Sequence, residues 1–164
     1  MKKFLLFMMM LFSTTVFAES VNAKVTNKIN FGISPKELKN IVKSEPLSDS
    51  HDDGNYAVYY FANVEDPLGV KRQLNSFAFS ENHLFSAVFD SVTTDEEHAK
   101  IIEAYKKNIN KISKEKMNIK EHKGALLLYN SKKIIEIYRV VDHTFINVAL
   151  YSAGKLNSIL KNYE

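Results

Sequence analysis

The sequence predicts an α+β fold: an antiparallel sheet with helices on one face, in the order α-βββ-α-βββ-α. Three observations predict it. Capping boxes open helical patterns at residues 34–37 and 94–97. Each helical pattern is followed by apolar runs that short turns separate. Groups of hairpin-linked strands between helices are typical of an antiparallel sheet that is covered on one side.

The first eighteen residues have the composition of a secretory signal. Lys2 and Lys3 give a positive start, residues 4–12 form an unbroken apolar run, and residues 16–18 (VFA) form a cleavage motif. The apolar run is far shorter than the roughly 20 residues of a membrane-spanning helix, and no later run approaches that length. We therefore expect cleavage after Ala18 and export to a bacterial periplasm, with Gram-positive secretion as the alternative.

The chain contains no cysteine. We therefore expect neither a lipid anchor nor disulfides, and the fold must be stabilised by burial alone. Loss of the signal lowers the net charge from +3 to about +1. Since phosphate backbones are bound by dense basic surfaces, nucleic acid is not an expected partner. We expect a flexible lead-in over residues 19–28 and one domain over residues 29–164.

The first half of the domain begins with a short helix. Ser34 is the expected N-cap, with proline next and Glu37 completing the capping box, and Pro46 enforces the stop. Residues 48–55 read as a polar turn and residues 65–69 as a break. The expected strands are residues 55–62, 73–79 and 84–89, the last two joined by a turn at 80–83.

The side chains of these strands divide between two faces. Phe77 and Phe79 are expected to share one face, and Phe85, Ala87 and Phe89 to share a face on the returning strand, both packed against a helix.

The second half repeats this theme. Thr94 and Glu97 open a helix of about five turns whose apolar stripe ends at Ile112, with lysines on its solvated side. We expect three further strands and a closing helix. They cover residues 125–129, 133–141, 144–151 and 156–163.

The sequence does not indicate a catalytic centre, a metal site or a cofactor. Residues 49–54 imitate the start of a calcium loop, but Tyr60 stands where the loop's final glutamate belongs. The five histidines lack metal-ligand spacing, and there is no serine-nucleophile motif. We expect no enzyme, although carboxylates that only folding brings together would escape this reading.

Tyrosines are the clearest candidates for binding. The strand at 55–62 has more large rings than a one-sided core needs, and alternate residues point to opposite faces. One set should therefore stay near the surface, unless another segment covers it. The candidate contact residues are this strand's tyrosines and the following loop: Tyr56, Tyr59, Tyr60, Asp66, Leu68 and Arg72.

Three stretches carry a resemblance. Residues 29–49 (INFGISPKELKNIVKSEPLSD), 54–61 (GNYAVYYF) and the hairpin at 74–84 resemble the BamE/SmpA family of outer-membrane assembly lipoproteins. The chain has Ser44 where that family has glycine. A similar helix-plus-sheet architecture occurs in β-lactamase-inhibitor-like proteins. The resemblance implies the fold of the first half and a role in binding other proteins.

The leading hypothesis is a periplasmic protein-binding module that engages another envelope or secreted protein, as a scaffold or as an inhibitor or immunity factor. The alternative is a carrier of a small molecule, lipid or peptide, which would need an apolar cavity of about 300 Å³ or more. A hydrolase built from scattered carboxylates and histidines is the third reading.

Overall fold

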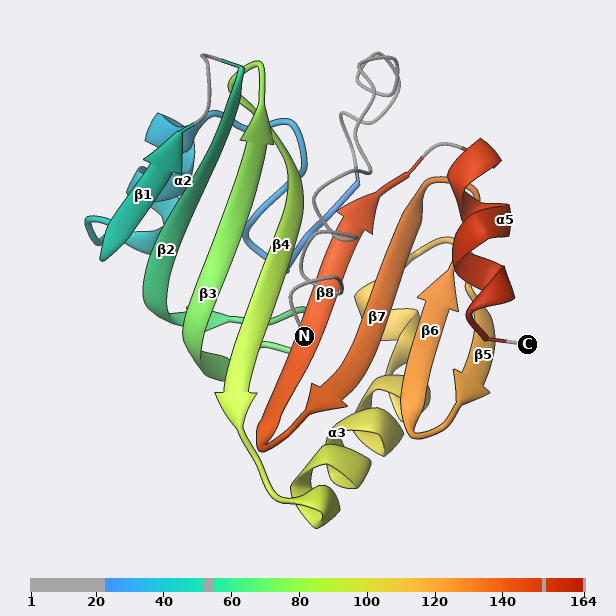
Figure 1. The fold of residues 1–164 in the computed structure, drawn as a ribbon. Coiled ribbons are helices and arrows are strands. Elements are labelled where there is room, and N and C mark those ends of the chain that lie inside the picture. The colour runs from blue at the N-terminus through green and yellow to red at the C-terminus, as the bar shows by residue number, and fades with distance from the viewer. Residues whose placement is uncertain (1–22, 52–54, 152, 164) are drawn as a thin grey trace.

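The computed structural model describes residues 23–51, 55–151 and 153–163. The expected signal peptide and residues 52–54 of the calcium-like loop lie outside these ranges. Eight antiparallel strands form one sheet in the order β1-β2-β3-β4-β8-β7-β6-β5 (Figure 1). The first four are β1 (Ser48–His51), β2 (Tyr56–Glu65), β3 (Lys71–Ser80) and β4 (His83–Val92). The second four are β5 (Asn118–His122), β6 (Ala125–Tyr129), β7 (Lys133–Val140) and β8 (His143–Leu150).

Four helices accompany the sheet in the described ranges: α2 (Pro35–Val42), α3 (Asp95–Lys107), α4 (Ile109–Ile112) and α5 (Ala153–Lys161). Both capping boxes are confirmed. The Ser34 hydroxyl accepts from the Glu37 backbone N–H while the Glu37 carboxylate accepts from the Ser34 N–H, and Thr94 and Glu97 repeat the arrangement. The expected five-turn helix is interrupted at Asn108, so that α4 is a separate short turn.

The predicted order α-βββ-α-βββ-α is wrong. Each half has four strands rather than three, because β1 and β5 lie in polar segments that lack the apolar pattern of a strand. All four residues of β1 are exposed, and most of β5 is exposed or half-exposed. Such edge strands bury neither face and so have no apolar alternation to reveal them.

The prediction that all helices lie on one face is also wrong. Leu38 of α2, Tyr105 of α3 and Ile112 of α4 join the main core on what we call the inner face. α5 packs on the opposite face, where Leu156, Ile159 and Leu160 meet a second apolar cluster around Leu127. In Figure 1, α2 and α3 lie behind the sheet and α5 lies in front of it, at the β5–β7 end.

The reason lies in β6 and β7, which are apolar on both faces. Leu126 and Leu128 belong to the main core, whereas Leu127 between them is fully buried in the second cluster. Ile134 and Ile135 of β7 divide in the same way. A strand with consecutive apolar residues needs cover on both sides.

The segment before α2 is packed rather than flexible. Val25 and Ile29 are 1% and 2% exposed, and Val25 N–H donates to the Ile29 carbonyl at 2.9 Å. Thr26 is also buried, and its hydroxyl accepts from the backbone N–H of Ile29. The expected lead-in therefore contributes to the core from residue 23 onward.

The β3–β4 hairpin turns at Glu81 and Asn82, whose φ values are +51° and +64°. Two successive left-handed residues match the right-handed twist of the flanking strands. A register shift next to Phe79 places Leu84, not Phe85, on the inner face. Phe85 instead contacts Tyr56, at 5.9 Å between ring centroids, so its expected place beside Ala87 and Phe89 is wrong.

Candidate protein-interaction face

One face of β2, β3, β4, β8 and β7 points away from α2, α3 and α4, and we call it the open face. The pairing register defines it, because directly paired residues share a face. One row across it is Tyr60, Ser76, Val88, Asn147 and Glu136, and the next is Ala62, Leu74, Asp90, Phe145 and Tyr138. α5 covers only the far end of these rows.

The three candidate tyrosines of β2 divide between the faces. Tyr56 and Tyr60 lie on the open face and are half-buried. Tyr59 lies on the inner face, where its ring meets Phe79 edge-on at 5.5 Å and its hydroxyl is 3.2 Å from His51 Nε2. The strand therefore divides as alternation predicts, and Tyr59 leaves the candidate contact set because it serves the core.

Asp66 and Arg72 form a buried ion pair at the β2–β3 turn. Asp66 Oδ2 accepts from Arg72 Nε at 2.8 Å and lies 2.7 Å from Nη2. The other oxygen, Oδ1, accepts from the N–H groups of Leu68 and Val70. Since Asp66 is 0% exposed and the Arg72 side chain 9%, neither can reach a partner, and the expectation that they bind one does not fit the structure.

The turn containing this pair reaches across the inner face toward α3 (Figure 1). Tyr105 of α3 is fully buried, and burial together with the Asp66 charge raises its pKa. Leu68 is half-buried and packs against the main core. The 65–72 loop thus joins the first half of the sheet to the second half's helix, which is a structural role.

A cluster that sequence reasoning missed lies on the open face where β4, β8 and β7 meet. The Tyr138 and Phe145 rings stack at 5.4 Å and 24°, and His143 stacks on Phe145 at 6.0 Å and 20°. His143 Nδ1 lies 2.9 Å from Asp90 Oδ1. We call these four residues the aromatic–acid cluster. Period-two spacing in 134–140 and 143–149 was the available signal, but the strands' partners had to be known first.

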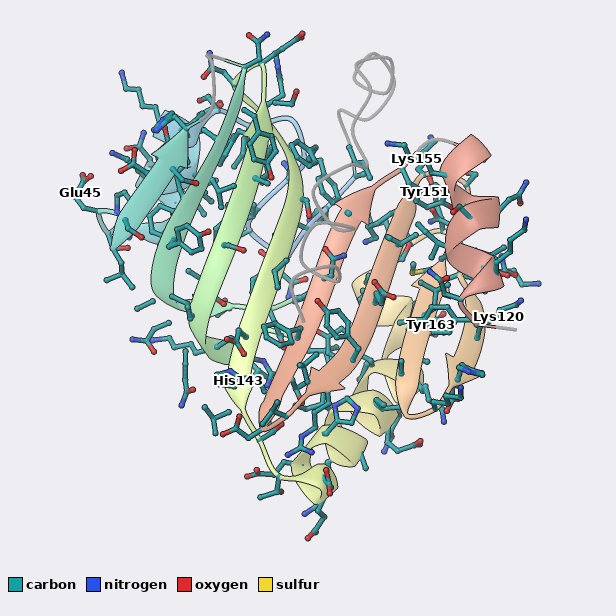
Figure 2. The ribbon with its side chains drawn as sticks, viewed as in Figure 1. Glu45, Lys120, His143, Tyr151, Lys155 and Tyr163 are labelled. Atoms are coloured by element: carbon teal, nitrogen blue, oxygen red, sulfur yellow. The ribbon has the colours of Figure 1, made fainter. Side chains whose placement is uncertain are left out.

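Charge and burial raise the pKa of three groups on this face. The Asp90 carboxylate raises the pKa of His143 by accepting its hydrogen bond. Burial raises the pKa of Tyr138 to about 12. Burial also raises the pKa of Glu136, whose Oε1 accepts from the Tyr163 hydroxyl at 2.8 Å. In Figure 2, His143 lies near the lower ends of β4 and β8, far from Tyr151, which follows β8, and from Lys155 of α5.

The middle of the open face is lined by small side chains. Ser76, Ala78 and Ser80 of β3 are half-buried, and Ser86 of β4 donates to Asn147 Oδ1 at 3.3 Å. Bulkier tyrosines stand on β2 to one side, and the aromatic–acid cluster stands to the other. The side chains on the open face are therefore shorter in the middle, along β3, than on either side of it.

The inner face contains a polar chain that looks catalytic but has a structural explanation. His98 Nε2 lies 2.8 Å from the Gly124 carbonyl and must donate to it, so Nδ1 accepts from the Thr144 hydroxyl at 2.9 Å. Thr144 is in turn 2.7 Å from the Thr93 hydroxyl. Every group has its partner, and the chain ties α3 to β8 and to the β5–β6 turn.

Within the described ranges, no three histidine, aspartate or glutamate residues come together as a metal site. A recess of about 170 Å³ lies beside α2, lined by Ile41, Val64 and Lys71 among others, and Lys28 pairs with Glu65 there at 2.9 Å. It is smaller than the roughly 300 Å³ that a carrier's cavity needs.

None of the described helices is long and apolar enough to cross a membrane. Comparisons give no relative: no protein-family model matches the chain, and no curated protein or solved structure matches it significantly. The resemblance to the BamE/SmpA family therefore stays a prediction.

Proposed function

We propose that this protein is an exported protein-binding module of the bacterial envelope, and that its partner docks on the open face. It acts as a scaffold or as an inhibitor or immunity protein, without catalysis of its own. The observation that carries the proposal is the contrast across the sheet. Three helices cover the inner face, whereas no described helix covers the open face over β2, β3 and β4 (Figure 1).

The side chains on the open face suit a protein partner. Tyr60 and Tyr138 combine a large apolar ring with a polar end, as residues that anchor protein interfaces do. The serines and alanines of β3 let a partner's loop approach the backbone closely. Neither edge of the sheet suits strand addition, because β1 is short and β5 carries Lys120 and Glu121.

Site-specific photocrosslinking tests the proposal. Tyr60 is replaced by photoreactive benzoylphenylalanine, which preserves an aromatic ring, and the variant is expressed with its own signal in the source bacterium. The matched control carries the same group at Lys100 of α3, whose side chain is 72% exposed on the helical side. We expect one discrete crosslinked protein from position 60 and none from position 100.

Equal crosslinking from both positions would contradict the proposal, as would reproducible absence of any product from position 60. The position-60 variant must unfold at the same urea concentration as the unmodified protein, so that a negative result reports on the surface.

A further inference from the structure

The open face is unusual in its charge. The chain has 22 lysine and arginine residues against 19 aspartates and glutamates. None of the 22 projects from β2, β3, β4, β8 or β7 onto the open face. The rows defined by the register contain two acidic residues instead: Asp90, and Glu136, which is paired with Tyr163 at the end that α5 covers.

The cations of these strands lie elsewhere. Lys133 pairs with Leu150 and donates to the backbone carbonyls of Lys24 and Ile112, on the inner side. Arg139 donates to the Thr93 carbonyl and pairs with Asp95 at the start of α3. Arg72 is buried against Asp66. The fourth basic residue of these strands, Lys71, is exposed and lines the recess beside α2 on the inner side. No basic side chain of these strands is therefore directed at the open face.

The aromatic–acid cluster is the part of this face that suits a cation best. His143 Nδ1–H donates to Asp90 Oδ1 at 2.9 Å, which holds the carboxylate in place. The Asp90 side chain is 15% exposed and that of neighbouring Asp142 is 62% exposed. The near-parallel rings of Tyr138 and Phe145 add surfaces on which a planar cation can stack.

From these observations we infer that the partner docking on the open face presents an arginine side chain to the aromatic–acid cluster. The guanidinium would pair with Asp90 and stack on the neighbouring rings. Guanidinium fits better than ammonium because it is planar and pairs with a carboxylate through two N–H groups. This inference rests on the proposed function and adds the chemistry of the partner.

A peptide titration tests the inference without the partner. The probe is acetyl-Gly-Arg-Gly-Arg-Gly-amide, followed through the amide NMR signals of ¹⁵N-labelled protein at low salt. The matched peptide carries citrulline in place of arginine, which keeps the shape and removes the charge. We expect the arginine peptide to shift the signals of Tyr138, His143 and Phe145, and the citrulline peptide to leave them in place.

Variants locate the effect. Asp90→Asn and Tyr138→Leu should each lower the affinity for the arginine peptide about tenfold, since the first removes the charge and the second removes the ring. Glu103→Gln, an exposed carboxylate on α3 that pairs with Lys106, should leave binding unchanged. Equal binding of both peptides, no shifts at the cluster, or insensitivity to Asp90→Asn would overturn the inference.

The two proposals fail differently. Suppose that a partner crosslinks at position 60 but binds the Asp90→Asn variant as tightly as the unmodified protein. The docking face would then be supported, and the arginine contact would be refuted.

Discussion

The two halves of the sheet have the same plan and different surroundings. Each is a helical segment followed by four antiparallel strands, and their last strands, β4 and β8, pair at the centre. In the second half, β6 and β7 are apolar on both faces and α5 covers the side away from the core. In the first half, β3 has phenylalanines on its inner face and serine and alanine on its open face. The number of apolar faces on the strands decides how many layers each half acquires.

The halves are held together by more than the central pair of strands. The β2–β3 turn of the first half brings its buried Asp66–Arg72 pair to Tyr105 of the second half's helix. The predictions below test how much each half depends on such contacts.

The largest effect is expected from Asp66→Ala. It leaves the Arg72 guanidinium buried without its counter-ion and removes the acceptor of two turn N–H groups, and the loss of folding free energy should be about 3–5 kcal/mol. Urea denaturation measures it. Glu65→Ala, which breaks only the exposed pair with Lys28, is the control and should cost at most about 1 kcal/mol. Similar losses in both variants would mean that the turn does not join the halves.

The contrast between covered and uncovered strands predicts the next effect. Leu127 is 0% exposed under α5, and Leu74 is 42% exposed on the open face. Leu127→Ala should cost about 2–5 kcal/mol, whereas Leu74→Ala should stay within about 0.5 kcal/mol. Thermal and urea unfolding of the two variants give the comparison. A small loss at Leu127 would show that α5 contributes little to the second half.

The smallest effect concerns how folding stability responds to pH at the boundary between the halves, where Asp90 of β4 contacts His143 of β8. Because Asp90 raises the pKa of His143, the pair's stabilisation is fully present below the ordinary histidine pKa of 6.5 and is lost as pH rises through the raised value. Asp90→Asn should lower the pKa of His143 in an NMR titration. Asp142→Asn should lower it less, since that carboxylate lies 3.8 Å from Nε2. If the pKa of His143 is unchanged in Asp90→Asn, the His143–Asp90 interaction does not stabilise the protein.

Much of the fold follows from local sequence. Ser34–Glu37 and Thr94–Glu97 specify helix starts through contacts three residues apart, and the long strands show in their apolar and aromatic residues. What the sequence concealed depends on partners far along the chain. β1 and β5 are strands only because a neighbour supplies their hydrogen bonds. The consecutive leucines at 126–128 are typical of a strand buried on both sides, and such a strand requires cover on the face where α5 packs.

The candidate site was predicted only in part. Alternation correctly separated Tyr56 and Tyr60 from Tyr59. The sequence predicts Asp66 and Arg72 to be accessible in a loop. They are buried because the turn folds back over the core, which local sequence does not show. The aromatic–acid cluster combines Asp90 with residues about fifty positions later, across β4 and β8. Such a cluster is visible only once the central pairing is known.

The polar margins of the sheet also bear on how the protein behaves when crowded. β1 offers four residues and β5 offers five, and Lys120 and Glu121 sit on the latter. Ile119, 47% exposed, is the one large apolar side chain there. A second molecule adding to either margin would gain few ladder bonds and would have to pair with strands that carry exposed polar and charged side chains. The sheet is thus protected against growing into fibrils, even though its broad uncovered side remains available for recognition.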